Sequence, residues 1–175
     1  MEYFDIYDIN RQKTDRKGVR GVKSPEGDMR LVVHICIFNK KGEMLIQHRQ
    51  PFKKGWSGLW DISVGGSAIA GDDSRQAAER EVKEELGLDL QITHRPNFNI
   101  NFDGGFDDFY LVDWDGDIKD LNLQYEEVES VKWAGRQEIL SMIEDGSFVP
   151  YYPSLINMIF DMKASPIKYG AHFRE

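Results

Sequence analysis

The stretch over residues 66–88 constrains the fold of this chain more than any other segment. It contains a glycine-rich turn, a run of residues 75–86 that are nearly all strong helix formers, and then Gly87. The residues just before the run, Asp-Asp-Ser at 72–74, are all good N-cap residues. Gly87 stands where a left-handed C-terminal cap would lie. The sequence therefore predicts a short helix with defined ends.

Three glutamates share one face of this predicted helix. At about 100° per residue, Glu81, Glu84 and Glu85 fall within roughly 100° of one another. Carboxylates on one partly buried face repel, and a bound cation would remove that repulsion. Oxygen ligands select hard cations, so we expect Mg²⁺, with Mn²⁺ able to replace it. An ordinary solvated helix is the alternative for a glutamate-rich pattern. The adjoining apolar stripe, expected to pack on the core, is Ala78, Val82 and Leu86.

The same stretch resembles the signature of the Nudix hydrolases: glycine, five residues, glutamate, seven residues, then Arg-Glu-apolar-x-Glu-Glu-x-Gly-apolar. The chain matches every specified position except 72, where aspartate replaces glutamate. The resemblance covers roughly residues 28–150. It implies an α+β fold, the Nudix-type α/β/α sandwich with a mixed β-sheet. We expect a single domain over residues 1–175, with 1–27 as an N-terminal extension and 151–175 as a C-terminal helix and tail.

The resemblance also implies roles for the residues of the signature. Glu84 and Glu85 are the expected metal ligands, and the backbone carbonyl of Gly65 is implied as a further ligand. Glu81 is expected either to bind metal or to orient or deprotonate water. Arg80 is expected to orient the glutamates through charge-assisted hydrogen bonds, without contacting the substrate.

Acids at the edge of the pattern have open roles. Asp72 is one methylene shorter than glutamate, so direct metal binding, binding through water and helix capping are its alternatives. Nudix hydrolases often use an acid from outside the signature, and a solvated loop charge is the alternative for every candidate here. The leading candidates are Glu126 and Glu127, and the others are Asp103, Asp107 and Asp108.

The loop over residues 49–60 is similar to the corresponding loop of isopentenyl-diphosphate isomerases, which share the Nudix fold. Carried over to this chain, the resemblance makes Arg49 and Lys53 candidates for binding phosphate. Trp56 and Trp60 are expected either to line a pocket or to pack in the core.

Isomerase activity is the rival function that this loop raises. The isomerases use a catalytic cysteine at the position of Gly65, followed by glycine and a metal-binding histidine. This chain has Gly-Gly-Ser at 65–67, and Cys36 lies in a different predicted strand. A non-catalytic nucleotide-binding sensor is the third alternative. We expect a Mg²⁺-dependent hydrolase of a nucleoside diphosphate linked to another group, and the sequence leaves the substrate open.

Composition limits the partners. The net charge is -8, with 30 acidic and 22 basic residues, which argues against binding to nucleic acid polymers or anionic membranes. The sequence shows no signal-peptide h-region and no long apolar segment, so a cytoplasmic location is expected. A homodimer interface and a cap on the core are the alternatives for the apolar C-terminal helix around Leu155, Ile156, Ile159 and Phe160.

The rest of the chain alternates between strand-like and turn-like segments. The opening residues 2–10 have strand character, and residues 11–27 are predicted as a turn or loop. A hairpin with its turn at 40–42 follows. Further strands are predicted on both sides of the signature helix, at 61–66, 108–114 and 126–134, and two helices are predicted at 136–146 and 153–163.

Overall fold

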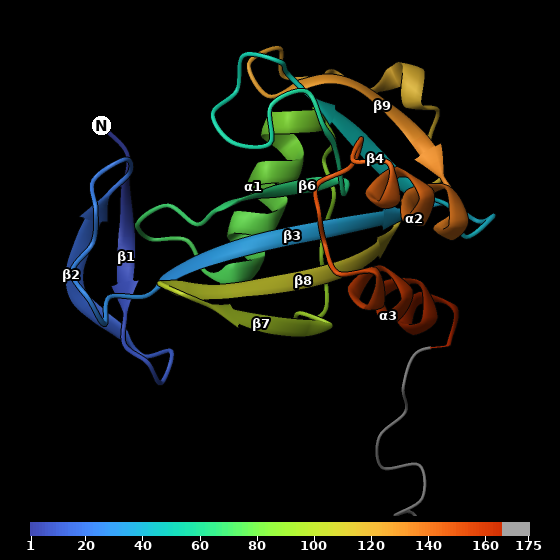
Figure 1. The fold of residues 1–175 in the computed structure, drawn as a ribbon. Coiled ribbons are helices and arrows are strands. Elements are labelled where there is room, and N and C mark those ends of the chain that lie inside the picture. Colours follow the sequence, from blue (N-terminus) through green and yellow to red (C-terminus); the bar gives the residue numbers. More distant parts are fainter. Residues whose placement is uncertain (166–175) are drawn as a thin grey trace, which may run out of the picture.

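A computed structural model describes residues 1–165 of the protein (Figure 1); the predicted C-terminal tail after this point lies outside the described residues. The elements, in chain order, are β1 (Tyr3–Tyr7), β2 (Lys13–Val19), β3 (Arg30–Phe38), β4 (Met44–Arg49), β5 (Trp60–Asp61), β6 (Val64–Ser67), α1 (Ser74–Leu86), β7 (Phe98–Phe102), β8 (Gly105–Asp113), the 3₁₀ turn η1 (Ile118–Asp120), β9 (Val128–Ala134), α2 (Arg136–Glu144) and α3 (Pro153–Ala164).

The main sheet of the described chain has seven strands. Strands β5, β4, β3, β8 and β7 lie in that order, while β6 also pairs with β3 and β9 with β4. Strands β3 and β8 run parallel along their whole length, and the other pairings of this sheet are antiparallel. The predicted mixed sheet is therefore confirmed.

Helices cover both faces of the sheet, and β3 shows why. Alternate residues of a strand point to opposite faces. Val33 and Ile35 belong to the core cluster that includes the apolar residues of α1, whereas Cys36 and Phe38 belong to the cluster that includes residues of α2 and α3. Figure 1 shows α1 on one side of β3 and β8, and α3 on the other. The predicted α/β/α sandwich is confirmed.

The sheet opens between β3 and β4. These two strands form the predicted hairpin, but their only register pair within the described residues is Phe38 with Met44, next to the turn. Beyond it, β3 pairs with β6, while β4 pairs with β5 and β9. The glutamate side of α1 lies under this opening, because Glu85 bonds to Gln47 of β4.

The N-terminal extension forms a separate two-stranded hairpin. The prediction of a loop over residues 11–27 is wrong for the part that forms β2, which pairs antiparallel with β1. The sequence of β2, KTDRKGV, is almost entirely polar and lacks the apolar alternation of a half-buried strand. Pairing with β1 satisfies its backbone and so decides its conformation.

Several contacts fasten this hairpin to the main domain, and two of them involve buried carboxylates. The Asp5 carboxylate accepts a hydrogen bond of 2.8 Å from the backbone N–H of Gly71, in the turn before α1. Arg11 forms an ion pair of 2.9 Å with Asp108 of β8, whose side chain is almost fully buried. The hairpin therefore packs directly against the segment that leads into the signature helix.

Helix α3 covers the core. Ile156, Ile159 and Phe160 are buried among residues of the same chain, and Leu155 packs against them half-buried. Of the two alternatives for this helix, the structure supports the cap on the core. No helix within residues 1–165 is long and apolar enough to cross a membrane.

Candidate active site

Helix α1 forms as the sequence predicts, with caps at both ends. The N-cap is Asp73, whose side chain accepts a hydrogen bond from the N–H of Gln76, and the Gln76 side chain accepts one from the Asp73 N–H. This reciprocal pair is a capping box. At the other end Gly87 has φ 67°, the left-handed conformation that favours glycine. Both ends of the acidic helix are therefore fixed.

Arg80 connects the acids of this helix to the preceding turn. Its Nη1 donates to Glu81 and to Glu84, each at 3.0 Å. Its Nε donates to Asp72 at 3.0 Å, and its Nη2 donates to the carbonyl of Ser67 at 3.1 Å. The guanidinium thus lies among carboxylates, in the position expected of an orienting residue. Asp72 contacts Arg80 and does not cap the helix, since Asp73 has that role.

Glu81 and Glu85 are buried, whereas Glu84 is half exposed. Burial raises the pKa of Glu85 to about 8, and the neighbouring charge of Glu81 acts in the same direction. Burial also raises the pKa of Glu81, although Arg80 opposes that effect. Gly66 of β6 lies against the Glu81 side chain. A Cβ added to Gly66 would come within 2.2 Å of the Glu81 carboxylate carbon. Glycine at this position leaves room for the acid.

The donor chemistry of these acids, rather than their present arrangement, fits a divalent cation. In residues 1–165 no three acidic, histidine or cysteine side chains already converge as a metal cluster, and the three carboxylates engage Arg80 and Gln47 instead. Two adjacent buried carboxylates are nevertheless costly without a compensating cation. Their all-oxygen chemistry matches Mg²⁺. Gly65, whose carbonyl the Nudix resemblance implies as a ligand, is the neighbour of Gly66 in β6.

Cationic side chains lie near these acids, since the charge of Lys53 acts to lower the pKa of Glu85. Arg49 ends β4, and its Nη1 donates to Asp61 at 3.1 Å. The buried Nε of Arg49 has no hydrogen-bond partner within residues 1–165. Lys53 pairs with Glu127, and burial together with the nearby Arg49 lowers the pKa of Lys53. A buried guanidinium N–H without an acceptor is suited to binding an anion.

A cleft of about 740 Å³ brings these groups together. Arg49 and Lys53 line it together with residues 65–67. Trp56 also lines it and is exposed, so the structure supports the pocket alternative for this residue; Trp60 is half-buried beneath Lys132. The sequence did not point to the cleft residues Arg20, Arg30 and His34, which carry no motif.

The acids proposed from outside the signature are divided by the fold. Glu126 and Glu127 both line the cleft, and Glu127 pairs with Lys53. The other three lie elsewhere: Asp107 pairs with His34 at 2.6 Å, Asp108 pairs with Arg11, and Asp103 lines a different cavity.

Position 65 leaves no space for a side chain. Gly65 pairs with His34 in the β3–β6 register, and a Cβ on Gly65 would come within 2.6 Å of the His34 ring. A cysteine would therefore collide at the site where the isomerases carry one. Cys36 is fully buried in the core under α3, where burial raises the pKa of its thiol far above the ordinary value.

Comparison with known proteins agrees with this geometry. The NUDIX domain family matches residues 28–152, which is most of the chain and includes β6, α1 and the 49–60 loop. The chain belongs to the Nudix family. An uncharacterized Nudix hydrolase of Listeria innocua is 44% identical over 164 residues, covering 93% of this chain and 96% of the relative. The similarity therefore includes most of the N-terminal hairpin region that precedes the family match.

Two further comparisons concern the fold and the isomerases. A crystal structure of a Deinococcus radiodurans protein superimposes with a TM-score of 0.73 at 20% identity, covering 90% of this chain and 97% of that one. This likeness concerns the fold. An isopentenyl-diphosphate Delta-isomerase of Halorhodospira halophila is 32% identical over 88 residues, half of each chain.

Proposed function

We propose that the protein is a Mg²⁺-dependent hydrolase that cleaves the diphosphate linkage of a nucleoside-diphosphate-X type substrate with water. The observation that carries this proposal is a cleft lined by cationic side chains and by the glycine strand that lies against the buried acids of α1. Arg49, Lys53 and residues 65–67 line the cleft, and the buried Glu81 carboxylate lies directly behind Gly66. Glu85, also buried, follows on the same helix face. A diphosphate suits such a cleft, because its oxygens bind both a metal ion and cationic side chains.

Each residue has a role in this proposal. Glu84 and Glu85, with the Gly65 carbonyl, hold Mg²⁺, which when bound neutralises phosphate charge and lowers the pKa of coordinated water. Arg80 keeps the glutamate carboxylates in place. Glu81 orients or deprotonates the attacking water, and burial raises its pKa, which favours a role as general base.

Other residues bind the substrate and complete the site. Arg49 and Lys53 hold the phosphate oxygens, and the unpartnered Arg49 Nε supplies one donor. Asp61 positions Arg49 by accepting its Nη1 hydrogen bond. Glu126 or Glu127 adds a further acid from outside the signature, since both line the cleft. Water attacks one phosphorus, and a phosphate-containing fragment leaves.

A substrate panel with two glutamine substitutions tests the proposal. We expect phosphate-containing products from at least one nucleotide sugar, ADP-ribose or dinucleoside polyphosphate in the presence of Mg²⁺ or Mn²⁺. Glu84→Gln and Glu85→Gln should each abolish this turnover with the fold retained. Arg75→Gln, an exposed change on the same helix, is the matched control. Wild-type rates in both glutamate variants would contradict the proposal.

The same panel separates the alternatives. The isomerase function predicts conversion of isopentenyl diphosphate without phosphate release, and the collision at position 65 argues against it. The sensor function predicts tight nucleotide binding by calorimetry with no turnover on any member of the panel. Product formation that depends on Glu85 would exclude the sensor.

A further inference from the structure

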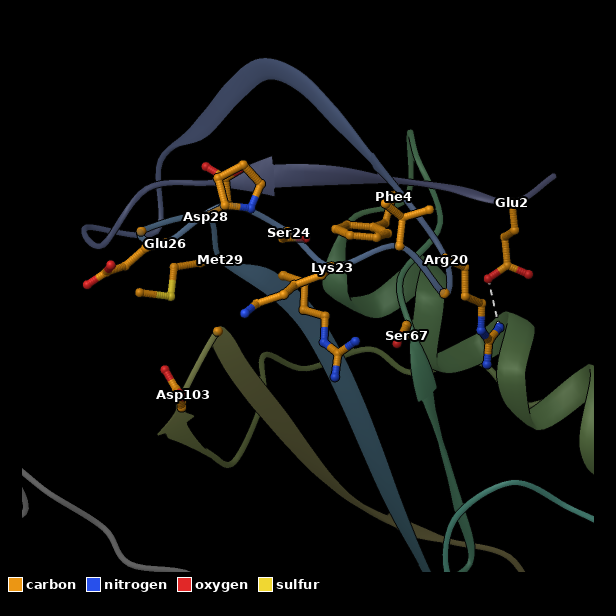
Figure 2. A pocket seen from close by; sticks show the side chains of 16 residues that line it. Glu2, Phe4, Arg20, Lys23, Ser24, Glu26, Asp28, Met29, Ser67 and Asp103 are labelled. Atoms are coloured by element: carbon orange, nitrogen blue, oxygen red, sulfur yellow. Dashed lines mark hydrogen bonds and ion pairs between the residues drawn. The ribbon is translucent and has the colours of Figure 1, made fainter.

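A second cavity, of about 1050 Å³, adjoins the active-site cleft. Residues of the N-terminal hairpin and of the loop over residues 20–30 line it, together with Asp103 from the β7–β8 turn and Ser67. Figure 2 shows the hairpin and its following loop along one side of this cavity, and Asp103 with Ser67 along the other. Arg20, Arg30 and Ser67 line both this cavity and the cleft, so the two spaces meet at these residues.

The wall of this cavity is fixed to the active site. The backbone N–H of Ala70 donates to the carbonyl of Tyr3 at 2.8 Å, which joins β1 to the turn before α1. In β2, Gly18 lies against the Phe4 ring, because a Cβ on Gly18 would come within 2.2 Å of it. Glycine at position 18 leaves room for the Phe4 ring, and Phe4 lines the cavity. The cavity is thus part of the ordered fold.

Arg20 marks the junction between the two spaces. Its Nη1 pairs with Glu2 of the hairpin at 2.7 Å, as the dashed line in Figure 2 indicates. Arg20 lines the cleft together with Lys53 and Gly66, and Gly66 lies against the Glu81 carboxylate. Arg20 also acts with burial and Arg49 to lower the pKa of Lys53. A phosphate bound by Lys53 in the cleft would therefore lie near Arg20, which lines the same cleft.

We propose that the N-terminal hairpin and the loop over residues 20–30 form the compartment that binds the group attached to the diphosphate. Arg20 holds the phosphate at the junction, and the attached group is polar and hydroxyl-bearing, as in a nucleoside or a sugar. This inference rests on the proposed hydrolase function. It gives the extension, which precedes the family match at residues 28–152, a role in substrate choice.

The lining of the compartment supports a polar occupant. Lys23, Glu26 and Asp103 contribute charged side chains. Asp28 also lines it: this carboxylate is 5% exposed, its Oδ1 pairs with Arg16 at 2.6 Å, and its Oδ2 has no hydrogen-bond partner within residues 1–165. A hydroxyl group supplies the donor that such an oxygen lacks. A prenyl chain would instead desolvate these charges without hydrogen bonds, which is unfavourable.

Filling the compartment tests the inference. Ser24 is half-buried and lines the cavity, so Ser24→Trp places a large ring inside it. Binding of ADP-ribose and of inorganic pyrophosphate is measured by calorimetry with Mg²⁺, alongside KM and kcat for each. We expect Ser24→Trp to weaken ADP-ribose about 10- to 100-fold relative to pyrophosphate. Asp15→Trp, an exposed position on β2 outside the cavity, is the matched control and should leave both unchanged.

Equal effects of Ser24→Trp on the two ligands would overturn the inference, as would no effect on ADP-ribose. Wild-type protein that binds isopentenyl diphosphate but neither ADP-ribose nor UDP-glucose would also overturn it. Binding is read separately from turnover, so the two proposals fail differently. If ADP-ribose binds and Ser24→Trp weakens it, but nothing is hydrolysed, the compartment is supported and the hydrolase proposal fails.

Discussion

Replacing Glu85 with glutamine is expected to stabilise the metal-free protein while abolishing its function. The Glu85 side chain is 4% exposed, and Gln47 is its one side-chain hydrogen-bond donor among the described residues. Burial and the neighbouring Glu81 raise its pKa from 4.5 to about 8. A carboxyl with a raised pKa favours folding when protonated. Its contribution is therefore complete below about pH 4.5 and is lost as the pH rises to about 8.

The size of the change in stability follows from the difference between the ordinary and the raised pKa of Glu85. Each unit of pKa corresponds to about 1.36 kcal/mol, so the change from 4.5 to about 8 corresponds to at most about 5 kcal/mol. Glu81 takes part in the same titration, so we assign about half of this free energy to Glu85. Glu85→Gln should therefore raise the free energy of unfolding by about 2 kcal/mol at about pH 8.5. Glutamine keeps the shape of the side chain and still accepts the Gln47 hydrogen bond.

Urea unfolding in EDTA at about pH 5 and pH 8.5 measures the free energy of unfolding. The free energy of unfolding of the wild-type protein should fall from pH 5 to pH 8.5, and that of Glu85→Gln should fall less. Added Mg²⁺ should stabilise only the wild type at the higher pH, by the linkage of binding to folding. Glu84→Gln is the matched control for stability, because Glu84 is half exposed. A Glu85→Gln variant no more stable than wild type at pH 8.5 would refute the reasoning.

Four further substitutions test other parts of the structure. Arg11→Gln removes the ion-pair partner of buried Asp108 and should lower the free energy of unfolding in urea by about 1–3 kcal/mol; no change would refute this anchor for the hairpin. Arg49→Gln should raise KM at least about tenfold with a smaller change in kcat, and an effect confined to kcat would contradict its binding role. Gly65→Ala should destabilise by about 1–3 kcal/mol through its 2.6 Å approach to His34, and His34→Ala should relieve this in a double-mutant cycle. Strict additivity of the two changes would contradict the collision.

Local patterns made α1 predictable. Its N-cap residues, its helix formers and Gly87 all act within a few residues, so neighbours along the chain settle its ends and its acidic face. The same holds for the strands with apolar alternation, such as β3. Strand β2 escaped prediction because it lacks that alternation and gains its conformation by pairing with β1.

The sequence by itself determined α1 and the acids that share its face, because these follow from short-range spacing, and the same motif carried the resemblance to the Nudix family that implied the sandwich. Only the tertiary structure decided which distant residues meet them. It brought Arg20 of the extension to the cleft, turned Asp107 towards His34 and paired Lys53 with Glu127. Such contacts join residues far apart in the chain. They depend on how the strands pair and where the sheet opens, which no local pattern encodes.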